Sequence, residues 1–234
     1  YVMNLNQLCW LEALADDVAA GKTSVGAAAK ILRTPKFRRP LYSTAQRSLA
    51  AFSMGCAVSY PTFEHWKASL VSGLIAFVTY WLTGPALARC AESAVFREFI
   101  GSLFTLLAST FAAYLLGGPL DAYTIGGIIL LVPGLTITTA ISELADQNFI
   151  SGTAKLMKGI LTLLSIGIAY LLFQELLPSL PLRQVVARPG SGAVLWTSAL
   201  GTIASVFGFS VIFQVPRKAL IWSTLTGLVG WAVF

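Results

Sequence analysis

An uncharged run with a proline and a glycine at its centre constrains this sequence more than any other feature. Residues 122–142 carry no charged side chain, and Pro133 and Gly134 stand near the middle of the run. A proline in a helix removes one backbone donor and clashes with the carbonyl four residues earlier, so we expect carbonyl oxygens near Leu130 to lack intrahelical partners. In hydrocarbon, such groups need protein, water or ligand as partners. The run therefore predicts a broken transmembrane helix that faces a polar cavity.

The composition places the rest of the chain in a membrane as well. Hydrophobic residues make up 56% of the 234 residues and charged residues 11%, with a mean hydropathy of +0.75, whereas a soluble domain carries about 25% charged residues. Runs of about 20 apolar residues match a hydrocarbon core about 30 Å thick. We expect an all-α, polytopic transmembrane bundle with about seven spans, at residues 46–62, 68–88, 99–117, 122–142, 157–175, 193–214 and 218–234.

The positive charges predict the orientation. Of the 16 Lys and Arg residues, all but Lys67, Arg183 and Arg188 fall in segments that are cytoplasmic when the N-terminus is cytoplasmic, as the positive-inside rule requires. This distribution predicts a multi-pass protein of the cell (inner or plasma) membrane. It also explains the net charge of +6 without a nucleic-acid partner. The three cysteines have no paired spacing, so neither a metal site nor a cofactor is expected.

The chain divides into an arm and two membrane units. We expect residues 1–45 to form a cytosolic amphipathic helical arm, 46–177 a first five-span unit, 178–192 an external linker and 193–234 the start of a truncated second unit. The chain opens on Tyr1 and stops at Phe234 inside an uncharged run, so we interpret it as an excerpt. Its expected partners are the lipid bilayer, the transported solute and protons, and a missing C-terminal unit, a partner subunit or a second copy of the chain.

Small residues and an internal similarity suggest how the spans pack. Gly55 and Gly73 sit in neighbouring spans where small residues allow close approach. The segment from Gly55 to Gly73 resembles the segment from Gly208 to Gly227, with a proline in each. Spans one and two would thus recur as spans six and seven, and because a unit of five spans is odd-numbered, the second unit would enter the membrane inverted, which is typical of transporters. Chance similarity between apolar segments is the alternative.

Three patterns in the middle of the chain resemble a known family. They are Leu131-Val-Pro-Gly134, Ala140-Ile-Ser-Glu143-Leu144 and Ser151-Gly-Thr-Ala-Lys155-Leu156. In this order they are similar to the LvPG…aI.DL…sG..RL pattern of the threonine/serine exporter family. The segment Gly208–Arg217 resembles the GFailFnvPrr opening of that family's second half, and Asp17–Ala28 is similar to the region before its first span.

The resemblance implies export of L-threonine and L-serine driven by the proton-motive force, as an antiport with protons. Two positions depart from the family pattern: Glu143 stands where Asp is common and Lys155 where Arg is common. A lysine lacks the planar fork of a guanidinium, which puts bidentate binding of a carboxylate at that position in doubt. The alternatives are a non-transporting membrane scaffold or receptor and a channel for small solutes. An enzyme is not expected, because no nucleophile–base pair or phosphate-binding loop is visible.

The candidate site residues follow from the chemistry of a zwitterionic hydroxyl amino acid. Carbonyls and amides freed at the break, with hydroxyls on the following helix, predict the substrate-binding residues Pro133, Gly134, Thr136, Thr139 and Ser142. The alternative for the threonines is hydrogen bonding back to their own helix. Proton coupling needs a titratable group, for which the candidates are Glu143, Asp146 and Asp121, with Lys155 and Lys158 as charge partners. For Glu143, the alternative is a simple ion pair with one of these lysines at the cytoplasmic surface.

Overall fold

The computed structural model describes residues 4–33, 40–63, 66–87, 93–176 and 193–233, and every regular element in this part of the chain is helical. The α-helices are α1 Leu5–Ala19, α2 Val25–Arg33, α3 Thr44–Phe63, α4 Trp66–Trp81, α5 Ala94–Leu116, α6 Leu120–Ile129, α7 Gly134–Ala145, α8 Phe149–Leu176, α9 Ala193–Ile212 and α10 Leu220–Val233. A π-helical turn, η2 (Leu82–Ala86), extends α4, and a 3₁₀ turn, η4 (Arg217–Ala219), precedes α10. The predicted all-α fold class is confirmed.

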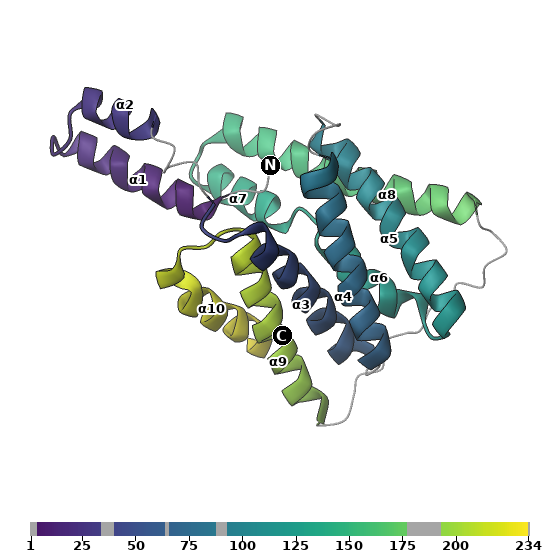
Figure 1. Ribbon diagram of the computed structural model, residues 1–234. Coiled ribbons are helices and arrows are strands. Elements are labelled where there is room, and N and C mark those ends of the chain that lie inside the picture. The colour runs from purple at the N-terminus through teal and green to yellow at the C-terminus, as the bar shows by residue number, and fades with distance from the viewer. Residues whose placement is uncertain (1–3, 34–39, 64–65, 88–92, 177–192, 234) are drawn as a thin grey trace.

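The predicted N-terminal arm consists of α1 and α2, and it extends to one side of the bundle (Figure 1). The amides of Leu5 and Asn6, at the start of α1, donate to the carbonyl oxygens of Phe213 and Gln214 at 3.1 and 3.0 Å, just past the end of α9. The unpaired amides at the start of one helix are thereby satisfied by carbonyls at the end of another. The two helix dipoles meet with opposite signs at this junction, which ties the arm to the bundle.

Length and apolarity allow three of the helices to cross a membrane. They are Trp66–Ala86 (α4 with η2), α5 and α8, and the bent pair of α6 and α7 makes a fourth if it counts as one span. The chain is therefore a membrane protein with three or four candidate spans in its described part. α3 occupies the first predicted span but carries Gln46 and Arg47 near its start, and α10 has 14 residues. The seven spans and their orientation stay predictions.

Many of the buried side chains are small and carry hydroxyl groups, while many large apolar side chains face outward. Ser72, Thr79, Ser102, Thr105 and Ser109 are fully buried. Phe111 is 64% exposed, Leu171 61% and Trp222 71%. An outer surface this apolar is unfavourable in water, whereas lipid tails solvate it. The small residues inside let the helices approach each other closely. This distribution of side chains agrees with a bundle whose outer surface faces lipid.

Glycines bring α3, α4 and α6 into backbone contact. A Cβ on Gly55 would lie 2.9 Å from the Cα of Gly73, and a Cβ on Gly126 would lie 2.8 Å from the Cα of Gly55. The hydroxyl oxygen of Ser72 accepts a hydrogen bond from the amide of Gly126 at 3.1 Å. The close packing predicted at Gly55 and Gly73 is confirmed, and Gly126 joins the same contact.

α3 also packs along α9, and the two helices run antiparallel. A Cβ on Gly201 would meet the carbonyl oxygen of Ala57 at 2.6 Å, and one on Gly208 would meet that of Ala50 at 3.0 Å. An inverted repeat requires this orientation, but the repeat itself stays a prediction. In Figure 1, α3 and α4 lie between α9 and α10 on one side and α5 and α8 on the other. The predicted external linker, 178–192, lies outside the described residues.

Helix α8 begins earlier than its predicted span. It starts at Phe149 rather than at residue 157, so Lys155 and Lys158 lie on the helix and not before it. Hydropathy locates only the apolar part of a helix, and the preceding polar turns continue the same backbone hydrogen bonds. This difference decides how the two lysines are presented to the neighbouring helices.

Candidate functional site

The membrane segment that contains Pro133 is broken in the structure. α6 ends at Ile129, α7 begins at Gly134, and the two helices are bent by 50° relative to each other. Pro133 has φ −80° and ψ 46°, and the amide of Gly134 donates to the carbonyl of Val132 at 2.9 Å. This geometry is that of an inverse γ-turn. The break predicted from the proline is confirmed.

Backbone groups on both sides of the break have no partner within the described residues. The carbonyl oxygens of residues 129–131 have no donor, and the amides of Leu135 and Thr136 have no acceptor. Pro133, at the cap position of α7, makes no side-chain capping bond. The break therefore presents free acceptors at the end of α6 and free donors, with the positive end of a helix dipole, at the start of α7.

A pocket of about 360 Å³ opens beside the break. It is lined from α6, the turn, α7 and α9 by Ile129, Val132, Gly134, Leu135, Thr138, Phe209 and Phe213. The rings of Phe209 and Phe213 are stacked, with centroids 5.8 Å apart and planes at 9°. A Cβ on Gly134 would meet no atom within 4 Å, so the backbone there is open. The volume lies at the lower end of the range of small-molecule sites, about 300–1,000 Å³.

None of the three predicted hydroxyls, those of Thr136, Thr139 and Ser142, lines this pocket. Thr138, which is not among the predicted site residues, does line it. The hydroxyl of Thr139 donates to the carbonyls of Leu135 and Thr136, at 2.8 and 3.1 Å. The hydroxyl of Thr138 likewise donates to carbonyls of its own helix. Hydrogen bonding back to the helix, the alternative considered for the threonines, is therefore what the structure shows for Thr138 and Thr139.

Glu143 forms an ion pair with Lys155 across the turn between α7 and α8. The hydroxyl of Ser151 donates to the second carboxylate oxygen at 2.5 Å, and both charged side chains are partly exposed. Gln147, with φ 63°, closes the turn, and the amide of Asn148 bonds the carbonyl of Glu143 at 2.8 Å. This is a Schellman ending of α7, which reverses the chain and brings α8 back along it. The predicted partnership of Glu143 with Lys155 is observed.

Comparison with known proteins identifies the family. The family model described as "Putative threonine/serine exporter" matches residues 2–176, which is most of the chain. The chain belongs to the threonine/serine exporter family. The match ends at the last residue of α8, so α9, which supplies Phe209 and Phe213, lies outside it. No curated protein and no solved structure matches the chain.

The other predicted charged residues of this threonine/serine exporter family member lie apart from the ion pair. Asp121 is in the first turn of α6, at the opposite end of the bent pair from Glu143. Asp146 caps the C-terminus of α7 and is exposed. Lys158 is positioned not against Glu143 but near Glu98 of α5, where its positive charge acts on that carboxylate.

Glu98 is a candidate that the sequence reasoning missed. It lies in the first turns of α5, and its Oε2 atom is buried without a hydrogen-bond partner in the described part of the structure. The sequence holds a signal for it, because Glu98 stands immediately before the uncharged run that starts at Phe99. A carboxylate at the edge of such a run is a candidate for function on the same grounds as Glu143.

Proposed function

We propose that this chain exports small hydroxyl amino acids, L-threonine and L-serine, across the cell membrane in exchange for protons. The family description names this cargo. The observation that carries the proposal is the break at Pro133, where unpaired carbonyls and amides lie beside a pocket of about 360 Å³. A helix that only anchors a protein in lipid has no use for such groups, because each is costly to leave unpaired in hydrocarbon.

The substrate is proposed to bind with its carboxylate at the start of α7. The free amides of Leu135 and Thr136 and the positive end of the helix dipole suit an anion. The free carbonyls of residues 129–131 and the ring faces of Phe209 and Phe213 suit the ammonium group. The oxygen of Thr138, whose hydrogen is already donated to the helix, can accept a hydrogen bond from the substrate hydroxyl. Thr136 thus contributes through its amide, while Thr139 and Ser142 lie farther along α7.

The pocket is lined by residues of both predicted membrane units. Gly134 and Leu135 belong to the predicted first unit, and Phe209 and Phe213 of α9 belong to the predicted second unit. We propose that the second unit, completed by further chain or by a partner subunit, forms the other wall of the transport path. This assignment follows the general rule that inverted-repeat transporters bind substrate between their halves.

Exchange of labelled substrate tests the proposed function. Proteoliposomes that contain the full-length protein and are loaded with unlabelled threonine should take up labelled threonine from outside without any proton gradient. The initial rate of this uptake should saturate as the external threonine concentration rises. Serine should compete, and a bulky apolar amino acid such as leucine should not. No exchange by the full-length protein would support the non-transporting scaffold, and flux without saturation or counterflow would support the channel.

The Glu143→Gln substitution is expected to reduce threonine efflux driven by a pH gradient about fivefold or more. Fivefold is about the smallest effect that one bound ligand typically has on the affinity for another, here the proton and threonine. The amide cannot bind and release a proton, and it leaves Lys155 without its ion pair. The pair is partly exposed, so little change in thermal stability is expected. The measurement is efflux from proteoliposomes as a function of the imposed pH difference. Unchanged efflux at every pH difference would remove Glu143 from the mechanism.

A further inference from the structure

Glu98 occupies an unusual position for a charged side chain. Ser102, Thr105 and Ser109 follow it on α5 at intervals that place all four residues on one face of the helix, and these three side chains are fully buried. Glu98 therefore lies at the entrance of the hydroxyl-lined interior of the bundle. Its Oε2 atom is buried and unpaired within the described residues. A carboxylate oxygen hidden from water without a donor is costly, so a structural role alone accounts poorly for it.

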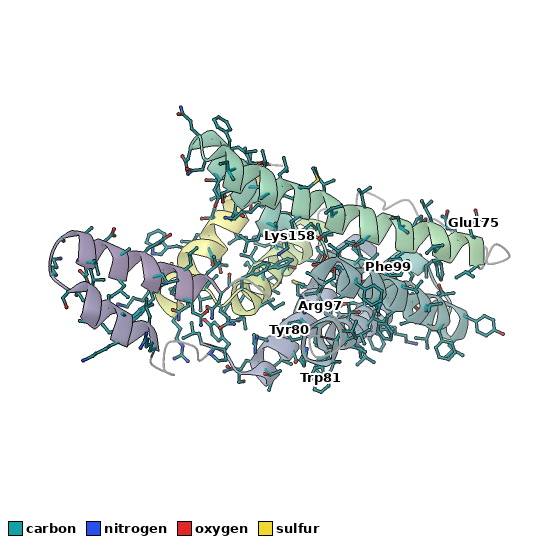
Figure 2. The ribbon with its side chains drawn as sticks, turned by 90° about the horizontal axis from the view of Figure 1, so that it is seen from above. Tyr80, Trp81, Arg97, Phe99, Lys158 and Glu175 are labelled. Carbon is teal, nitrogen blue, oxygen red and sulfur yellow. The ribbon has the colours of Figure 1, made fainter. Side chains whose placement is uncertain are left out.

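Neighbouring side chains stabilise the charged form of Glu98. The side chain of Thr162, on α8, and the charges of Lys158 and Arg97 favour the charged form of this carboxylate. Figure 2 shows Arg97 and Lys158 in the same region of the molecule, with Glu175 at the far end of α8. The Oε2 atom, which has no hydrogen-bond partner within the described residues, remains available to a proton.

The charged groups on the other helices packed against α5 lie away from Glu98. α4, η2 and α6 contact α5. Lys67 is in the first turn of α4, and Asp121 is in the first turn of α6. Each lies at the end of its helix that is away from the start of α5. Tyr80 of α4 is the titratable group that lies toward the start of α5. Lys158 and Arg97 are therefore the charges that govern Glu98 in the described structure.

Helix α8 connects this carboxylate to the ion pair at Glu143. Lys155, Lys158 and Thr162 are spaced at i, i+3 and i+7, which places them along one face of α8. Lys155 forms an ion pair with Glu143 of α7, whereas Lys158 acts on Glu98 of α5 through its charge at longer range. α8 thus presents one cation to each of two acids from two different helices. A change of charge on either acid alters the electrostatic attraction that holds its helix to α8.

We infer that Glu98 is a second proton-binding carboxylate of the transport cycle, with Thr162 and Lys158 as its positioning residues. This inference rests on the proposed proton-coupled export. When a proton from the outer side binds, an O–H bond forms at Oε2 and the carboxylate becomes neutral, leaving Lys158 without its counter-charge. Release of the same proton to the cytoplasm breaks that bond and restores the attraction between α5 and α8. The cycle needs no reactant besides the proton and the amino acid carried in the opposite direction.

The test compares two modes of transport in proteoliposomes that contain the full-length protein. The Glu98→Gln substitution should preserve exchange of labelled for unlabelled threonine, which needs no net proton movement. Efflux driven by a pH gradient should fall about tenfold or more and lose its dependence on pH. The Glu98→Asp substitution should retain gradient-driven efflux, because a titratable carboxyl remains. The Glu12→Gln substitution, the same change on the exposed face of α1, should behave as wild type in both modes.

Three results decide whether Glu98 binds the transported proton. Gradient-driven efflux that stays at the wild-type level in the Glu98→Gln variant would overturn the inference. Loss of exchange together with gradient-driven efflux in both the Gln and the Asp variants would also overturn it, because it would show a structural role. A Thr162→Val or Lys158→Gln substitution that shifts the pH profile of efflux, with exchange intact, would support it. Absence of exchange in the wild-type protein would instead refute the proposed function, so the two failures are distinguishable.

Discussion

Replacing Gly134 with leucine is expected to abolish threonine exchange while the protein still folds. A Cβ at this position meets no atom within 4 Å, so the new side chain can be built without displacing the backbone. It would fill the pocket beside the free amides of Leu135 and Thr136. We expect a loss of about a hundredfold, the size that misplacement of a bound group produces in enzymes. The measurement is initial-rate exchange of labelled threonine in proteoliposomes.

The matched control for this variant is Gly167→Leu. Gly167 lies in α8, is exposed, and also has no atom within 4 Å of a Cβ. The same substitution there adds the same apolar bulk to the protein but lies away from the pocket, so exchange should remain at the wild-type rate. Wild-type exchange in the Gly134→Leu variant, or equal losses in both variants, would show that substrate does not bind at the break.

The Gly126→Ala substitution is expected to destabilise the protein strongly. A Cβ on Gly126 would lie 2.4 Å from the hydroxyl oxygen of Ser72 and 2.8 Å from the Cα of Gly55. The second of these atoms is backbone, so α6 can accept the methyl group only by moving away from α3. Overpacking of this kind costs about 1–3 kcal/mol. The separation would also weaken the hydrogen bond from the amide of Gly126 to Ser72.

Thermal unfolding in detergent measures this effect, with Gly134→Ala as the control. Alanine at residue 134 has open space around it and restricts the unfolded chain more than glycine does, which favours the folded state by about 0.4–1 kcal/mol. The two alanine variants should therefore shift the unfolding temperature in opposite directions. A Gly126→Ala protein as stable as wild type would contradict the backbone contact between α3, α4 and α6.

Local chemistry explains which features could be predicted from the sequence. The break at Pro133 follows from the missing amide of one residue, and the helical arm follows from its amphipathic pattern. The close approach of α3 and α4 follows from the small residues Gly55 and Gly73 in two neighbouring spans. Each of these inferences concerns a residue and its near neighbours in the chain, where few alternatives compete.

The pocket and the second carboxylate depend on residues that are distant in sequence. Phe209 and Phe213 reach the break only because α9 packs along α3, which spacing in the sequence does not reveal. Helical periodicity placed Thr136, Thr139 and Glu143 on one face but could not say which face turns to the pocket. That choice is made by the packing of α7 on α8, where Gly152 meets Leu144. Glu98, like Glu143, borders an uncharged run, but the run that follows Glu98 has no proline near its middle to mark it as broken.

Protection of a thiol at residue 134 is the most direct test that substrate binds at the broken helix. In full-length protein with its native cysteines replaced by serine, the Gly134→Cys variant should react with a water-soluble maleimide. Threonine and serine should slow this reaction with the same concentration dependence as exchange, and leucine should not. A Gln147→Cys control, exposed in the turn after α7, should react at a rate that no amino acid changes. Equal labelling at residue 134 with and without saturating threonine would contradict binding at the break.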